Sequence, residues 1–307
     1  MNVYAIIVIY NGMHRDWIQK CFSSLRNSEH PLQVIAIDNN SKDESVKYIE
    51  QNFPEIELIK SDKNLGFGGA NNLGIKLALE KNADAVFLLN QDAWIEPKTI
   101  SELVRISQNN EDFGIISPLQ LDGTGERLEN GFSYSISSKF NKDFFSDFVL
   151  KKQTKELYET IESYAASWFI TKKCLKIVGG FNPSFFHYGE DDNYCRRVTF
   201  KNLKIGVTPN TFICHDTYEK PKSNFFNYFE IEKRQLTTFH SEPNKIIDSK
   251  KKLIFRHRMK TLKYFFLFDF KFAKINYDIL NFLSNDYDKI IENKMKPISK
   301  NEYIFLK

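Results

Sequence analysis

Apolar residues follow two alternating patterns over the first third of the chain. Short unbroken apolar runs are typical of strands buried on both faces of a parallel sheet, and apolar residues spaced three or four apart predict helices. Strands are predicted over 3–11, 33–39, 56–62 and 85–90, and helices over 17–25, 69–82, after a capping box at 41–44 and after Pro97. This alternation predicts an α/β fold with a mostly parallel, doubly wound sheet.

The regular pattern ends near residue 121, and residues 134–162 have no clear period, which predicts a variable loop region. Later segments are a strand, short helix and Gly-Gly turn over 165–181, a helix over 189–200, a hairpin or two short strands over 204–215, and a helical, aromatic and basic region after 225. We therefore expect an α/β domain over 1–224, divided at about residue 120, and a helical extension over 225–307.

The composition allows a sizeable core but favours neither a disulfide framework nor a zinc module. Hydrophobic residues make up 42% of the 307 residues, and the four cysteines are scattered without a CxxC pair, which suits a reducing cytosol. We find no run of about 18 apolar residues, so no membrane span is predicted. No signal peptide precedes the first predicted strand, and we expect a cytoplasmic location.

The charge is concentrated at one end of the chain. Residues 241–307 hold 15 Lys or Arg and 8 Asp or Glu, whereas the rest holds 28 and 31. Within 250–266, seven Lys and Arg surround a helical stripe of Phe255, Met259, Leu262 and Phe266. Such a helix suits an anionic membrane, on the inner face of which the protein would be peripheral, or packs on the α/β domain with its basic face in water. Nucleic-acid binding is not expected, because no motif for it is present.

Polar residues follow each of the four predicted strands. They are Tyr10 and Asn11, the DNNS stretch from Asp38, NLGFGGANN at 64–72, and Asn90 to Asp92. Ligands of open parallel sheets bind beyond the carboxyl ends of the strands. Four such ends on one edge therefore predict a binding site.

The residue types in these ends suit a nucleotide diphosphate with a divalent cation. Asp38 can accept the N3–H of uracil or thymine, and glycines at 66, 68 and 69 allow close backbone approach. Asn71 and Asn72 are expected at a helix start, which attracts anions. Asn90 would contact ribose or phosphate, and Asp92 would bind Mg²⁺ or Mn²⁺. Each feature also has a structural interpretation, because Asp38 and Asp92 can cap helices and GFGG is most often a turn.

Taken together, the motifs resemble those of the family 2 glycosyltransferases, especially their rhamnosyltransferase-like bacterial branch. The matching stretches are VIYNG, DNNSKD, NLGFGGANN, LLNQDAW and, at 178–197, VGGFNPSFFHYGEDDNYCRR. The resemblance implies a GT-A fold with a nucleotide-sugar half and an acceptor half. It also implies inverting transfer from a UDP- or dTDP-sugar to a glycan or lipid-linked acceptor in surface polysaccharide synthesis.

The resemblance implies roles for single residues. Asp38 matches the residue that reads the base, Asp92 the metal-binding end of a DxD-type motif, and Asp191 the catalytic base. His215 matches a histidine that often completes the metal or diphosphate site, and Arg234 an arginine near the phosphates. The remaining candidates are Tyr10, Asn11, Asn40, Asn64, Gly66, Asn71 and Asn90 for the nucleotide sugar, and Trp168 and Glu190 for the acceptor or sugar.

Two motifs depart from the family pattern. Asn90-Gln91-Asp92 offers a single carboxylate, so the phosphates would supply other metal ligands. The acceptor signature usually ends Glu-Asp-x-Asp but here ends Asp191-Asp192-Asn193. The resemblance therefore retains Asp191 as the base. Asn193 stands where the family has its last acidic residue, so the role of that residue is lost unless Asp192 takes it over.

Inverting transfer needs a carboxylate that removes the acceptor proton, and Asp191 is the candidate, its pKa raised by Glu190 and Asp192. The competing interpretation is an acidic first helical turn that complements the helix dipole. Likewise, His215 and Trp168 are also typical of buried structural residues. A non-catalytic sugar- or membrane-binding relative is the alternative function. An NAD-dependent oxidoreductase fits less well, because the first turn lacks GxGxxG.

Overall fold

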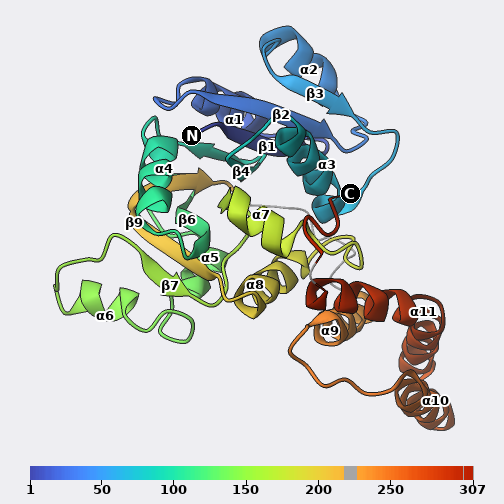
Figure 1. The fold of residues 1–307 in the computed structure, drawn as a ribbon. Helices are drawn as coiled ribbons and strands as arrows, with labels where there is room; N and C mark the ends of the chain where they lie inside the picture. The colour runs from blue at the N-terminus through green and yellow to red at the C-terminus, as the bar shows by residue number, and fades with distance from the viewer. Residues whose placement is uncertain (218–226, 300, 307) are drawn as a thin grey trace.

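The computed structural model describes residues 1–217, 227–299 and 301–306 (Figure 1). Its strands are β1 (Val3–Ile9), β2 (Leu32–Asp38), β3 (Glu57–Lys60), β4 (Ala85–Asn90), β5 (Ala93–Ile95), β6 (Phe113–Asp122), β7 (Tyr158–Thr160), β8 (Ser167–Thr171) and β9 (Lys204–His215). Its helices are α1 (Trp17–Arg26), α2 (Ser45–Asn52), α3 (Gly66–Glu80), α4 (Thr99–Asn109), α5 (Asn130–Ser135), α6 (Phe144–Val149), α7 (Lys172–Val178), α8 (Glu190–Phe200), α9 (Tyr228–Ser241), α10 (Lys250–Phe266) and α11 (Phe270–Met295), which a short 3-10 helix (Lys296–Ile298) follows.

The strands form one mixed sheet in the order β3-β2-β1-β4-β8-β6-β9-β5, with β7 paired to β9. Strands β1 to β4 run parallel, and β8 is antiparallel to both β4 and β6. The carboxyl ends of β1, β2, β3 and β4 therefore share one edge. The predicted mostly parallel α/β sheet is confirmed.

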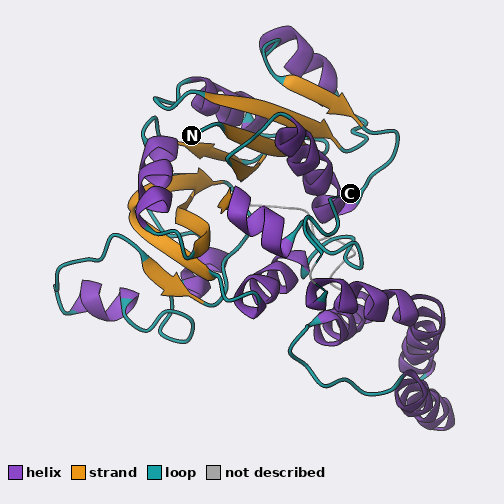
Figure 2. Ribbon diagram, viewed as in Figure 1, coloured by secondary structure: helices purple, strands orange, loops and turns teal. Residues whose placement is uncertain are grey.

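Helices cover both faces of the sheet (Figure 2). Alternate residues of β1 point to opposite faces: Ala5 and Ile7 belong to a core shared with α1, α2 and α4, while Tyr4 and Ile6 belong to a core shared with α3, α7 and α8. Burial on both faces explains why the strands are apolar without a polar break.

Four local predictions differ from the structure. Helix α2 begins at Ser45 and not after a Ser41 cap, because Ser41 Oγ instead accepts a hydrogen bond from Asn11 N–H at 3.0 Å. Helix α3 begins at Gly66, three residues earlier than predicted. Residues 204–215 form one strand with a register shift against β6, not a hairpin. Within 134–162, short elements α6 and β7 occur, which carry too few residues to give a visible period.

Helices α9, α10 and α11 confirm the predicted helical extension, and Leu253, Ile279 and Leu283 form a hydrophobic cluster of their own there. The extension is joined to the α/β part by Asn193 Nδ2 to Ser241 Oγ at 3.0 Å and by Asn293 Nδ2 to Ser184 Oγ at 2.9 Å. The predicted boundary at 224 lies outside the described residues. Across the described ranges, no helix is both long and apolar enough to cross a membrane.

Candidate active site

The turns after β1 and β2 are held together by hydrogen bonds from their own polar side chains. Asn11 Oδ1 accepts from Lys42 N–H at 2.8 Å, and Asp38 Oδ1 accepts from Ser41 N–H at 3.2 Å. Asn11 and Asn40 adopt left-handed φ angles of 47° and 66°, which asparagine tolerates well. The buried Asp38 thus lies in a rigid turn at the carboxyl edge, next to Asn11 and Asn40.

Asn39, which the sequence did not single out, connects this turn to the start of α3. Its Oδ1 accepts from Leu65 N–H at 2.7 Å, and its Nδ2 donates to Asn64 Oδ1 at 3.0 Å. Asn64 Oδ1 also accepts from Gly66 N–H at 2.8 Å. Asn64 therefore orders the loop between β3 and α3 at the same edge as Asp38.

The glycines of GFGG allow close packing within the protein. A Cβ atom at Gly66, where φ is 74°, would lie 2.1 Å from the carbonyl oxygen of Phe186, and one at Gly68 would lie 2.9 Å from Phe181 Cβ. The structure thus gives these glycines a packing reason in addition to the ligand approach expected from the sequence. The prediction that Asn71 lies at a helix start is wrong, because α3 begins five residues earlier and Asn71 Nδ2 donates to Phe67 O within the helix.

Gln91, the residue that follows β4, has a structural role at this edge. Its Oε1 accepts from Tyr10 N–H at 2.9 Å, and its Nε2 donates to Tyr10 O at 3.0 Å. This pair of bonds holds the ends of β1 and β4 together. Tyr10 is itself half exposed at this edge.

Asp92 and His215 meet although 122 residues separate them in the sequence. Strand β5 pairs antiparallel with β9 so that Ala93 faces His215, and His215 Nε2 lies 3.3 Å from Asp92 Oδ1 and 3.4 Å from Asn90 Nδ2. Both side chains are largely buried. Asn90, Asp92 and His215, three residues predicted separately, therefore form one polar cluster.

This cluster fits one divalent cation. Two ligands at about 2.1 Å from a metal and at right angles to each other lie about 3.0 Å apart, close to the distance between Asp92 Oδ1 and His215 Nε2. A carboxylate oxygen and an imidazole nitrogen both suit Mn²⁺. Over the described residues, no group of three or more His, Cys, Asp or Glu could hold a metal, so a ligand such as a diphosphate would have to complete the shell.

Asp191 lies at the first turn of α8, beside the end of β4. The backbone of Ala165 lies close enough to the Asp191 carboxyl group to act on its pKa, and the next residue, Ala166, accepts a hydrogen bond from Asn90 N–H at 3.0 Å through its carbonyl. Two consecutive residues therefore connect the predicted base to the predicted nucleotide edge.

The carboxyl groups around Asp191 shift one another's pKa upward. Burial, and then the charge of Asp192, raises the pKa of Asp191 to about 7. Burial, and then Asp191, raises the pKa of Glu190 to about 8. Tyr164, which is partly exposed, lies near this cluster. Burial and the charge of Asp191 raise the pKa of its hydroxyl to about 12. A carboxyl group with a pKa near 7 suits proton transfer at neutral pH.

Arg234 and Trp168 lie at different depths. Arg234, on α9, lies with its guanidinium carbon 5.5 Å from the centre of the Tyr188 ring. Burial raises the pKa of Asp192, and the charges of Arg196 and then Arg234 limit that rise. Trp168 is fully buried and stacks on Phe181. The prediction that Trp168 contacts a sugar is therefore not supported, because its ring belongs to the core beneath α3 and α8.

Two residues fix the Gly-Gly-Phe turn ahead of α8: Asn72, which was expected at a helix start but lies inside α3, and Arg197, which the sequence did not single out. Asn72 Oδ1 accepts from Phe181 N–H at 2.6 Å, and its Nδ2 donates to Phe181 O at 2.9 Å. The buried Arg197 donates to Val178 O at 2.8 Å and to Gly180 O at 2.7 Å. These contacts hold the segment 178–189, here called the acceptor segment, against α3.

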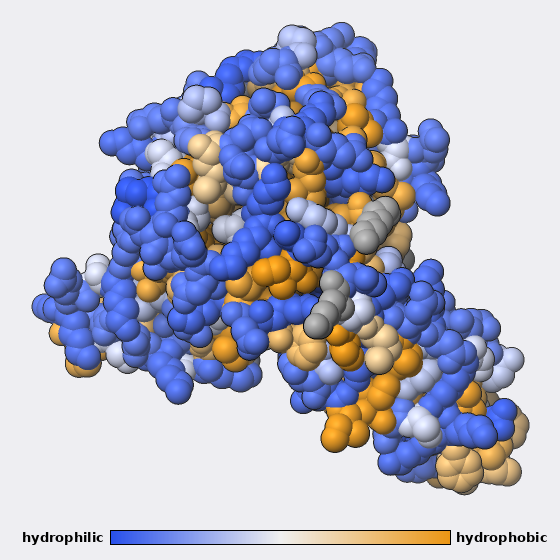
Figure 3. Space-filling view, in the orientation of Figure 1, coloured by the Kyte–Doolittle hydropathy of each residue, from blue (hydrophilic) through white to orange (hydrophobic). Residues whose placement is uncertain are grey.

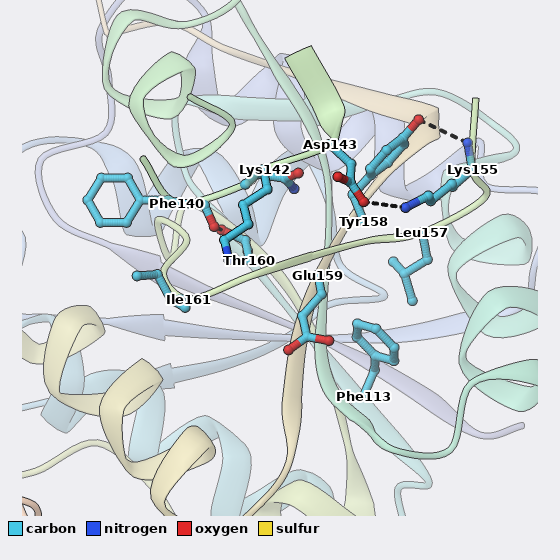
Figure 4. A pocket seen from close by; sticks show the side chains of 11 residues that line it. Phe113, Phe140, Lys142, Asp143, Lys155, Leu157, Tyr158, Glu159, Thr160 and Ile161 are labelled. Atoms are coloured by element: carbon cyan, nitrogen blue, oxygen red, sulfur yellow. Dashed lines mark hydrogen bonds and ion pairs between the residues drawn. The ribbon is translucent and has the colours of Figure 1, made fainter. Parts of the chain in front are cut away.

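Two surface pockets of about 530 and 490 Å³ lie away from this site. The larger is lined by Phe113, Tyr158 and Glu159 near the amino ends of β6 and β9 (Figure 4). The smaller adjoins the amino ends of β2 and β3. Since the polar cluster lies at the carboxyl ends, neither pocket is the candidate site.

Comparisons with known proteins agree with this geometry. The sequence model of the family described as Glycosyl transferase family 2 matches residues 4–167. The chain is 26% identical over 201 residues to the low-salt glycan biosynthesis hexosyltransferase Agl10 of Haloferax volcanii, an alignment covering 65% of this chain and 63% of that protein, just under two thirds of its length. It is 22% identical over 219 residues to the dTDP-rhamnosyl transferase RfbF of Shigella flexneri, covering 71% of this chain and 70% of that protein.

The fold is similar to solved glycosyltransferases. Residues 1–349 of S. aureus TarS, in complex with UDP-GlcNAc, align with a TM-score of 0.57 and 15% identity, covering 97% of this chain and 90% of that one. At this identity the likeness shows the GT-A-like fold alone. Other glycosyltransferase structures with similar folds contain Mn²⁺.

Proposed function

We propose that this chain, which belongs to glycosyl transferase family 2, transfers a sugar from a nucleotide-diphosphate donor to an acceptor hydroxyl with inversion at the anomeric carbon. The observation that carries the proposal is the connection through Ala165 and Ala166, which brings Asp191 to the strand edge of Asn90. A base at the nucleotide edge is the arrangement that a single in-line displacement requires.

The donor would lie along the carboxyl edge. Asp38 has its Oδ1 engaged by the turn, and its other oxygen would accept N3–H of a pyrimidine base. Tyr10, Asn11, Asn40, Asn64 and Asn90 surround that edge and would contact the base, ribose or phosphates. Asp92 and His215 would hold a divalent cation, which would offset the negative charge of the departing diphosphate.

The chemical step needs one proton acceptor. The acceptor oxygen forms a bond to the anomeric carbon while the bond from that carbon to the diphosphate oxygen breaks, and the hydroxyl proton passes to the Asp191 carboxylate. Burial, together with the negative charge of Asp192, keeps the basicity of Asp191 high. Glu190 and Tyr164 would border the acceptor, and Arg234 would lie near the donor phosphates, as the family resemblance implies.

The donor class and acceptor are inferred from weaker support. The name of the Shigella relative states a dTDP-rhamnosyl activity, and Asp38 suits thymine as well as uracil, so we propose a dTDP- or UDP-sugar, with rhamnose or another hexose transferred. A glycan or lipid-linked saccharide in surface polysaccharide synthesis is the proposed acceptor.

Calorimetric titration tests the donor half of the proposal. The wild type is titrated with UDP, dTDP, GDP and NAD, each with and without Mn²⁺. We expect one pyrimidine diphosphate to bind, with Mn²⁺ increasing its affinity, and Asp92→Ala to lose that increase. The matched control Asp43→Ala removes a carboxylate from the nearby turn but should keep the metal effect.

Each other outcome has a defined meaning. Binding of GDP alone would keep the transferase but overturn the role of Asp38 in reading a pyrimidine. Binding of NAD alone, or of no diphosphate with or without metal, would contradict the proposed function.

A further inference from the structure

Helix α10 carries large side chains on two opposite sides, and one of these sides is uncovered. Leu253 and His257 pack toward α11 and are 1% and 2% exposed. Residues two positions away project about 200° around a helix, and there the stripe of Phe255, Met259, Leu262 and Phe266 is 49–74% exposed. The stripe therefore does not pack on the α/β domain, and α10 packs on α11 through its opposite side.

The exposed stripe continues through the turn between α10 and α11. Phe265, Leu267, Phe268 and Phe270 are 55–80% exposed, and the Phe270 ring centre lies 5.8 Å from that of Phe265 and 6.3 Å from that of Phe268. In Figure 3, apolar side chains gather at the lower right, where Figure 1 places α10. Contiguous apolar surface of this kind marks an interaction site. We call the stripe and the turn together the apolar tip.

The charge around the apolar tip favours an anionic partner. Residues 250–274 hold nine Lys or Arg and one acidic residue, Asp269, whose Oδ1 is engaged in capping α11 through Phe272 N–H. Lys252 and Arg256 pair with Asp248. Lys251, Arg258 and Lys263 flank the stripe on both sides and form no ion pair with any residue in the described ranges. A second copy of the tip would bring like charges together, which disfavours self-association through this surface.

We propose that the apolar tip inserts into the interfacial layer of an anionic lipid bilayer. The phenyl and aliphatic side chains would enter the boundary between headgroups and acyl chains, and the flanking Lys and Arg would contact lipid phosphates. The helical extension that carries the tip is attached to the acceptor segment and to α8, because Asn293 on α11 bonds Ser184 and Ser241 on α9 bonds Asn193. Together with the proposed function, this arrangement would hold the acceptor side of the enzyme at the surface that carries a lipid-linked saccharide.

Vesicle flotation of the full chain tests the proposal. The probes are phosphatidylcholine vesicles with and without phosphatidylglycerol. We expect flotation with the anionic vesicles, weakened by salt, and a loss of at least about tenfold in the bound fraction for Phe266→Glu with Phe268→Glu. Arg258→Glu with Lys263→Glu should abolish the preference for anionic lipid. The controls are Phe145→Glu with Leu150→Glu, which change apolar residues that are also more than half exposed, on and beside α6, and should float as the wild type does.

Absence of flotation of the wild type with anionic vesicles would overturn the proposal, as would equal flotation of the tip and α6 variants. A dimer in solution that the tip variant converts to a monomer, without flotation, would assign the surface to self-association instead. Nucleotide titration on the same samples separates the two proposals. Normal nucleotide binding without flotation contradicts the membrane proposal alone, and flotation without nucleotide binding contradicts the proposed function alone.

Discussion

The two sides of the candidate site are held in place by different kinds of interaction. The nucleotide edge consists of turns in which Asp38 and Asn64 bond backbone groups two or three residues away and Asn11 bonds the backbone of the next turn, at Lys42. The acceptor segment is held by residues far apart in sequence, since Asn72 reaches Phe181 across 109 positions and α3 glycines pack on Phe181 and Phe186. We therefore expect loss of one contact to cost less stability at the exposed turns of the nucleotide edge than at the buried contacts of the acceptor segment.

Replacement of Arg197 should give the largest stability loss. Arg197→Met leaves the carbonyls of Val178 and Gly180 without their buried donor, and we expect a loss of about 3 kcal/mol in the free energy of unfolding. Urea unfolding followed by circular dichroism measures it. Lys42→Met, which removes an exposed cation from the nucleotide edge, should cost less than about 0.5 kcal/mol. Equal losses in the two variants would contradict the contrast between the two sides.

Enlargement of Gly68 should give the next largest effect. A methyl group at 68 meets Phe181 Cβ at 2.9 Å, so Gly68→Ala should destabilise the protein by about 1–3 kcal/mol through overpacking. At the neighbouring Gly69, the nearest atom is Leu65 Cβ at 3.2 Å. Gly69→Ala should have a clearly smaller effect, because alanine also favours the helix. Thermal unfolding of the two variants side by side distinguishes them, and a Gly68→Ala protein as stable as the wild type would disprove the tight contact with the acceptor segment.

The smallest predicted effect is a shift of the pH profile. Asp191 must be ionised to accept a proton, so kcat/KM should rise with pH through about 7, the raised pKa of Asp191. Removal of the neighbouring charge in Asp192→Asn lowers that pKa, and the rise should move to lower pH by roughly one unit. Rates measured from pH-controlled nucleotide release test this. Asp112→Asn, at the opposite end of the sheet, should leave the profile in place, and an unmoved profile in Asp192→Asn would contradict the electrostatic coupling.

The sequence predicted the nucleotide edge better than the acceptor segment, for a physical reason. Apolar runs and turn-forming Asn, Asp and Gly depend on neighbours within a few residues, so β1 to β4 and their polar ends could be located from pattern alone. The contacts of Asn72 and Arg197 depend on how distant segments pack, and neither residue type has a local signature for that. Trp168 illustrates the same limit, because a tryptophan in a strand has one appearance in sequence whether it is buried or exposed.

In the helical extension, the apolar stripe visible in the sequence is not the side of the helix that is buried. The stripe of Phe255, Met259, Leu262 and Phe266 correctly indicated a helix, but its spacing could not tell which side packs. In the structure the less obvious side, with Leu253 and His257, is the buried one. The polar residue His257 bonds Asn276 Oδ1 through Nδ1 at 3.1 Å, a pairing that no local pattern indicates.

A comparison of binding and turnover in Asp191→Asn tests the central claim most directly. If Asp191 is the base beside the nucleotide edge, the variant should bind the nucleotide diphosphate with wild-type affinity and lose about 10²–10⁴-fold in kcat. Both are measured on one preparation, by calorimetry and by sugar transfer to a hydroxyl acceptor. Wild-type turnover in Asp191→Asn would contradict the account.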